Sequence, residues 1–173
     1  LDLYLDLWWI AHTGQRLFSG ERLTPGLAAN EWQRFLDIVL ALQDMETPRR
    51  ATVLGFLRGL ALFHLSRIGE ARDVFKDVER QSFAVRSRRR VIRTYLASTA
   101  EGTPRTYHGT IAWLDHRGRK GDIYVEELRT EITFFAHDFR LDDPRRGLDV
   151  GEFHIAFNFL GPIADPPGFG ARR

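Results

Sequence analysis

The feature that most constrains the fold is a change in hydrophobic periodicity near residue 100. Before this point apolar residues recur at intervals of three and four, as in amphipathic helices, and beyond it they alternate with polar residues, as in half-buried strands. The segment 98–104, Ser-Thr-Ala-Glu-Gly-Thr-Pro, is rich in turn-forming residues. The sequence therefore predicts an α+β chain with a helical region at 1–98, a linker at 99–105 and a β domain with a C-terminal tail at 106–173.

The helical region is expected to contain antiparallel helical hairpins joined by short turns. Ser19-Gly20 and Thr24-Pro25-Gly26 interrupt the periodic runs, and Thr47-Pro48 is typical of a cap followed by proline at the first helical position. The expected helices cover residues 1–18, 28–45, 48–66, 70–80 and 84–96.

Residues 52–83 resemble one tetratricopeptide repeat. Gly59 and Ala71 stand where that repeat has small residues between two closely packed helices, and Leu62 and Phe75 occupy its large apolar positions. Arg58 replaces the usual leucine, and the terminal proline of the repeat is missing. The resemblance implies a helical surface that binds a protein, and a plain helical bundle is the alternative.

The β domain is predicted to form a small five-stranded antiparallel barrel of the oligonucleotide-binding type. Alternation marks strands at 106–115, 121–126, 131–137 and 152–159, and a fifth short strand follows Gly161-Pro162. Strict alternation places Tyr124, Phe135 and His137 together on an exposed face. Trp113 reaches that face only if its strand contains a bulge.

Four segments of the β domain are together similar to a cold-shock domain. They are GTIAWLD at 109–115, RKGDIYV at 119–125, TFFAHDF at 133–139 and VGEFHIAFNFLGPIAD at 150–165. The resemblance implies sequence-tolerant binding of single-stranded RNA or DNA. Carried over residue by residue, it implies nucleic-acid contacts at Trp113, Lys120, Tyr124, Phe135 and His137. Asp122 departs from the pattern, because the family usually has an exposed aromatic there.

The distribution of charge points to a second part of the same surface. The whole chain carries a formal net charge of +2, yet residues 80–120 contain ten basic and two acidic side chains. Arg86, Arg89, Arg90 and Arg93 would share one helical face, and Arg117 and Arg119 lie in the loop before the second strand. Such an excess is typical of a phosphate-binding surface. The alternative is a solvated helix face that docks an acidic protein.

Catalytic signatures are absent from the sequence. There is no Gly-rich phosphate loop, no Gly-x-Ser-x-Gly and no His-Glu-x-x-His, and the spacing of the six histidines fits no standard metal-ligand pattern. The chain has no cysteine, which excludes thiolate zinc sites and fits a reducing compartment. We therefore expect a non-catalytic cytoplasmic protein without cofactor, metal or membrane span.

Two functional hypotheses follow. In the first, the β domain binds single-stranded nucleic acid and the helices recruit other proteins. In the second, the helices bind a protein or another domain of the same chain, and the barrel is only a structural cap with its aromatic residues packed on the helices. The start at Leu1 rather than Met leads us to expect a part of a larger multidomain protein.

Overall fold

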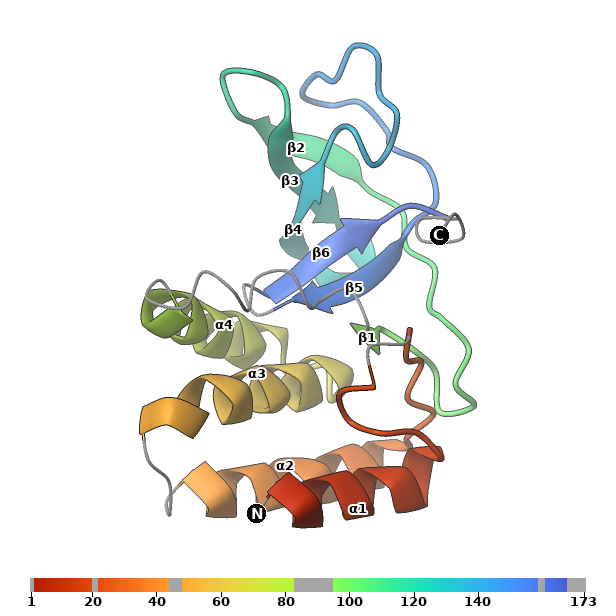
Figure 1. The fold of residues 1–173 in the computed structure, drawn as a ribbon. Helices are drawn as coiled ribbons and strands as arrows, with labels where there is room; N and C mark the ends of the chain where they lie inside the picture. The colour runs from red at the N-terminus through yellow and green to blue at the C-terminus, as the bar shows by residue number, and fades with distance from the viewer. Residues whose placement is uncertain (1, 20–21, 44–47, 83–94, 159–160, 168–173) are drawn as a thin grey trace. The chain divides into compact units, whose positions relative to one another are not determined.

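The computed structural model describes residues 2–19, 22–43, 48–82, 95–158 and 161–167. These residues form an α+β protein whose chain divides into two compact units (Figure 1). The first unit comprises Leu1–Pro104 and Phe157–Gly161, and the second comprises Arg105–Ala156 and Pro162–Arg173. A short segment of the β half of the sequence therefore belongs to the helical unit.

The first unit contains four helices within the described residues. They are α1 (Asp2–Thr13), α2 (Ala29–Gln43), α3 (Pro48–His64) and α4 (Ile68–Ser82). They confirm the first four helices predicted from periodicity, with ends that differ by up to five residues. The predicted fifth helix at 84–96 is wrong at its end, because Tyr95–Leu96 form strand β1. There the Leu96 backbone N–H donates to the Leu23 carbonyl at 2.9 Å, and the rest of that prediction lies outside the described residues.

Aromatic side chains form the centre of the first unit. Trp9 is fully buried, and its ring centroid lies 5.9 Å from that of Trp32 and 5.1 Å from that of Phe35. Tyr95 packs against the same indole at 5.9 Å and brings β1 into this core. Large aromatic rings bury much apolar area and prefer such tilted or edge-on contacts, so they hold α1, α2 and β1 together.

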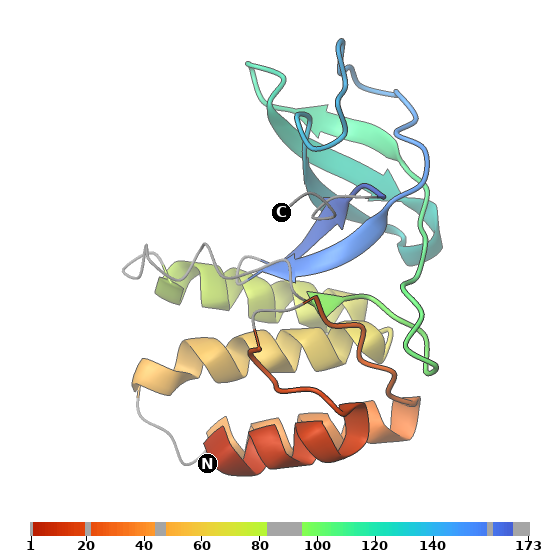
Figure 2. The same ribbon diagram turned by 45° about the vertical axis from the view of Figure 1, so that its right-hand side comes forward.

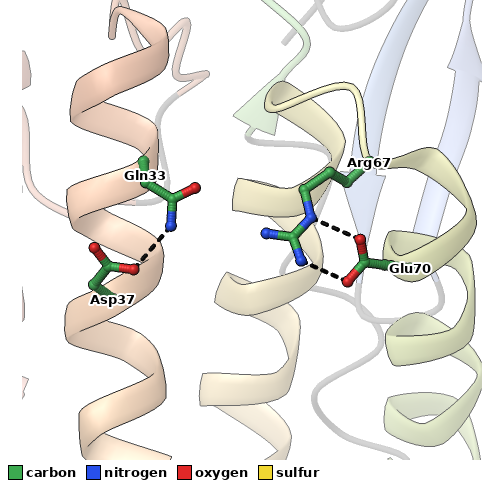
Figure 3. A network of polar contacts seen from close by, with 4 residues as sticks. All are labelled: Gln33, Asp37, Arg67 and Glu70. Carbon is green, nitrogen blue, oxygen red and sulfur yellow. Dashed lines mark hydrogen bonds and ion pairs between the residues drawn. The ribbon is translucent and has the colours of Figure 1, made fainter.

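Glycine allows α3 and α4 to pack closely. A Cβ atom at Gly59 would lie 2.7 Å from Cζ of Phe75, so only a glycine leaves room for that buried ring. At the turn between these helices, the Arg67 guanidinium donates to both carboxylate oxygens of Glu70, at 2.7 and 2.6 Å (Figure 3). This hydrogen bonding lowers the pKa of Glu70, although both groups are exposed and such pairs stabilise little.

We expect Gly59→Val to destabilise the first unit by about 1–3 kcal/mol, because the added methyl groups would overlap the Phe75 ring. Urea unfolding followed by tryptophan fluorescence measures the loss. Gly69→Ala in α4 is the control, because no atom lies within 4 Å of an added Cβ there. The control should be neutral or slightly stabilising. Equal stability of Gly59→Val and the wild type would contradict the packing argument.

The strands are β1 (Tyr95–Leu96), β2 (Thr110–Leu114), β3 (Lys120–Val125), β4 (Thr130–Phe135), β5 (His154–Asn158) and β6 (Gly161–Asp165). Their order in the sheet is β1-β5-β6-β4-β3-β2. The β2–β3 and β3–β4 pairs are antiparallel, whereas β4 and β6 are parallel, with Thr133 opposite Ile163. Each segment predicted from alternation overlaps a strand, although β2 begins four residues later than predicted and β6 includes Gly161-Pro162 instead of following them.

The predicted five-stranded antiparallel barrel is wrong. The strands form a mixed, open, six-stranded sheet that has β1 and β2 at its two ends. Two features cause the difference: β1 adds a strand where helix was expected, and β6 runs parallel to β4 rather than closing an antiparallel ring. The outer edge of β2 is instead bonded by a loop, since the Gly147 N–H donates to the Ile111 carbonyl at 2.8 Å.

Residues at the end of β5 and the start of β6 contribute to the core of the helical unit. Phe157 is fully buried, with its ring centroid 4.8 Å from that of Phe63 and 6.2 Å from that of Phe75. Gly161 has a φ of +114°, and a Cβ atom there would lie 3.3 Å from the Phe75 side chain. Phe157 therefore packs against α3 and α4, and Gly161 lies close to α4.

Candidate nucleic-acid interface

One face of the β2–β3–β4 sheet carries exposed and half-buried side chains in three rows. In the register of the strands, Trp113 is opposite Asp122, and Asp122 is opposite Thr133. These three residues form the central row. The row on one side of it contains Tyr124, and the row on the other side contains Lys120 and Phe135, which are opposite each other. The residues that alternate with these point to the interior, for example Ile123 and Phe134, which are fully buried.

A bulge brings Trp113 onto this face. The register of β2 against β3 shifts between Ile111 and Trp113, so Ala112 is the additional residue. Ile111 is 1% exposed and Trp113 is 52% exposed. The two residues therefore point to opposite sides of the sheet, although strict alternation would place them on the same side.

The other aromatic residues predicted for the site lie in the neighbouring rows. Tyr124 is 38% exposed, and Phe135 is half-buried with its ring centroid 5.8 Å from that of His137. His137 is exposed and follows the end of β4, where its Nε2 lies 2.7 Å from Oδ1 of Asp138. The face thus presents four rings at different degrees of exposure, from Trp113 in β2 to His137 beyond β4.

Three cations lie beside the aromatic face, two in the loop between β2 and β3 and one at the first residue of β3. Arg117, Arg119 and Lys120 are all exposed. The loop is held by Asp115, whose Oδ1 accepts hydrogen bonds from the backbone N–H groups of Arg119 at 2.7 Å and Lys120 at 3.4 Å. These bonds, that of Arg119 above all, lower the pKa of Asp115. Asp115 also attracts the Arg119 guanidinium, and Nε of Arg117 donates to Nε2 of His116 at 3.1 Å, but both arginine side chains remain exposed.

Two further arginines belong to this basic end of the unit, and the sequence analysis missed them. Arg145 and Arg146 are exposed and follow Pro144, which packs near Gly118: a Cβ atom built on that glycine would lie 3.5 Å from Cγ of Pro144. Both loops extend from the same end of the sheet (Figures 1 and 2). The sequence does contain an adjacent pair of arginines before Gly147. The segment around them is rich in acidic residues, so its net charge did not indicate a basic surface.

Acidic groups limit where a phosphate could lie. Asp122 and Glu131 occupy the sheet face itself, and Asp143 lies 3.8 Å from Arg145 in the loop. Positive charge is therefore concentrated at the loops, whereas the sheet face combines aromatic rings with carboxylates. Phosphate groups would be favoured at the loops and opposed over the sheet.

The remaining predicted contacts, Arg86, Arg89, Arg90 and Arg93, lie outside the described residues. Among the residues that the structure describes, no group of three or more His, Asp or Glu side chains could hold a metal ion. His108, for example, is exposed, with its ring nitrogens 3.9 Å from Oε1 of Glu127 and 3.5 Å from Oε1 of Glu152. No helix in the described ranges is both long and apolar enough to cross a bilayer.

Comparison of the chain with protein-family models, with curated proteins and with solved structures found no match. The function is therefore argued from the geometry of the site.

Proposed function

We propose that this chain is a non-catalytic module that binds single-stranded nucleic acid on the β2–β3–β4 face. The observation that carries the proposal is the exposure of Trp113 and Tyr124 on one sheet face, at 52% and 38%, beside loops that present several cations. Bases stack on exposed aromatic rings with about 1–3 kcal/mol each, largely independently of sequence. A single-stranded nucleic acid offers both the bases and the phosphates that such a surface would contact.

The aromatic and the cationic side chains would have separate roles. Trp113, Tyr124 and Phe135 would stack bases over the sheet, with His137 next to Phe135. Cations of the two loops and of the start of β3 would neutralise phosphates, which releases counterions and makes the affinity depend on salt. The cations are Lys120, Arg117, Arg119, Arg145 and Arg146.

A specific observation also favours protein binding by the helical unit. Leu3, Tyr4 and Leu7 of α1 are 70%, 59% and 55% exposed, and large apolar side chains clustered on a surface are typical of interaction sites. The second candidate function is therefore a scaffold within a larger multidomain polypeptide, in which α1 contacts a protein or another domain. In either case the cysteine-free composition leads us to propose a cytoplasmic location.

The salt dependence of binding tests the proposed function. We expect the full chain to bind a labelled oligothymidine of about ten nucleotides at low salt, within the range of lengths that single-strand binders cover. Fluorescence anisotropy measures the affinity over a series of salt concentrations. Replacing Arg117 and Arg119 together by alanine should reduce the slope of log K against log salt by about 1.4, because each lost phosphate contact removes about 0.7.

Arg34→Ala with Arg72→Ala is the matched control, since these exposed arginines belong to α2 and α4 of the first unit. The control pair should leave the slope unchanged. Absence of binding at low salt by a chain with an intact circular dichroism spectrum would sink the proposal. So would an equal loss of slope in the loop and control variants.

A further inference from the structure

Asp122 holds the central position of the aromatic face. It lies between Trp113 of β2 and Thr133 of β4 in the register of the sheet, and it is half-buried. The Thr133 hydroxyl donates to Oδ1 of Asp122 at 3.1 Å. Within the described residues, Oδ2 of this carboxylate has no such donor. One oxygen is thus held in place, and the other can accept a hydrogen bond from a ligand.

A carboxylate at this position is unfavourable for a phosphate but suitable for the edge of a base. Repulsion between like charges keeps the phosphates at the cationic loops. A base stacked on Trp113 would have its edge near Asp122, because side chains directly opposite on antiparallel strands have Cβ atoms about 4.5–5.5 Å apart. The carboxylate would then accept hydrogen bonds from N–H groups of that base.

The arrangement of donors on the bases selects one of them. Guanine presents two adjacent donors on its Watson–Crick edge, N1–H and the N2 amino group, and these match the two oxygens of a carboxylate. In adenine and cytosine the amino group stands beside a ring nitrogen that accepts, and in thymine and uracil the single N–H lies between two carbonyl oxygens. Each of these acceptors would face the carboxylate and repel it.

We propose that Asp122, oriented by Thr133, makes this face prefer guanine in single-stranded nucleic acid. This inference rests on the proposed function, because it assigns a base preference to the same face. Asp122 and Thr133 act by different means: Asp122 contacts the base, and Thr133 is a positioning residue that fixes one carboxylate oxygen.

Oligothymidines of about ten nucleotides, identical except at one central base, provide the test. The central base is thymine, guanine or hypoxanthine, which keeps N1–H but lacks the N2 amino group. We expect the full chain to bind the guanine oligonucleotide about tenfold more tightly than the thymine one, which corresponds to about 1.4 kcal/mol. The hypoxanthine oligonucleotide should fall between them. Anisotropy competition at constant low salt measures the ratios.

Substitutions distinguish recognition of the base from a general effect of charge on binding. Asp122→Asn should remove the preference for guanine while binding to oligothymidine persists or increases, because a negative charge is lost. Thr133→Val should reduce the preference without changing the charge. Glu131→Gln is the matched control: it removes a carboxylate from the same face, opposite Tyr124, and should leave the preference intact.

The outcomes distinguish the two proposals. Equal binding of the guanine and thymine oligonucleotides by the wild type would overturn the guanine preference and leave the proposed function standing. Absence of binding to every oligonucleotide would overturn the proposed function itself. Loss of the preference to the same extent in Glu131→Gln and Asp122→Asn would also overturn the role of Asp122, because a general effect of charge would then explain it.

Discussion

Replacing Trp113 and Tyr124 together by alanine should weaken binding of an oligothymidine by about 2–6 kcal/mol, since each stacked base contributes about 1–3 kcal/mol. The chain should remain folded, because Trp113 is 52% and Tyr124 38% exposed and neither is part of the buried core. Anisotropy of a labelled oligonucleotide measures the affinity without using the tryptophan signal. Thermal unfolding of the same variant shows whether the fold is retained.

Tyr4→Ala provides the control for this experiment. Tyr4 is 59% exposed on α1 of the first unit, so its loss removes an exposed aromatic ring elsewhere in the chain. We expect the control to bind like the wild type. An unchanged affinity of the double variant would show that the sheet face is not the binding surface. A large loss of stability would instead indicate that these rings support the fold.

Phe157→Ala should destabilise the first unit by about 3–5 kcal/mol, the usual cost of removing a fully buried phenyl ring. Its contacts with Phe63 and Phe75, at centroid distances of 4.8 and 6.2 Å, would be lost, and a cavity would remain. Chemical unfolding followed by tryptophan fluorescence reports this change, because Trp9 and Trp32 are buried in that unit.

Leu7→Ala is the comparison for Phe157→Ala. Leu7 is 55% exposed on α1, and we expect its truncation to cost less than about 1 kcal/mol. A similar cost for the two variants would contradict the assignment of Phe157 to the core of the helical unit.

Most individual elements could be predicted from the sequence, because their signals are local. Pro48 marked the start of α3, and alternation located β3 and β4 to within one residue at their first positions. The pairing of strands could not be predicted in the same way. Alternation is identical whichever strand is the neighbour, so nothing in the sequence indicated that Thr133 would lie opposite Ile163 in a parallel pair.

The candidate site was predictable where it depends on alternation along one strand. Tyr124 followed directly from its buried neighbours Ile123 and Val125. The position of Trp113 depends on a bulge, which arises from the pairing of two strands and not from β2 alone. Pro144, which precedes Arg145, lies near Gly118 only through tertiary packing between distant parts of the chain, so the contribution of Arg145 could not be predicted from local sequence.

Because residues 157–161 belong to the helical unit, that unit is built from two separate stretches of the chain. A single cut after Pro104 would give an N-terminal fragment without Phe157, and a C-terminal fragment carrying a phenyl ring whose contacts, Phe63 and Phe75, lie on the other fragment. The two units are therefore not two consecutive stretches of the chain, and a single cut does not separate them. The core of the first unit therefore contains a phenyl ring that is synthesised only after β2, β3 and β4.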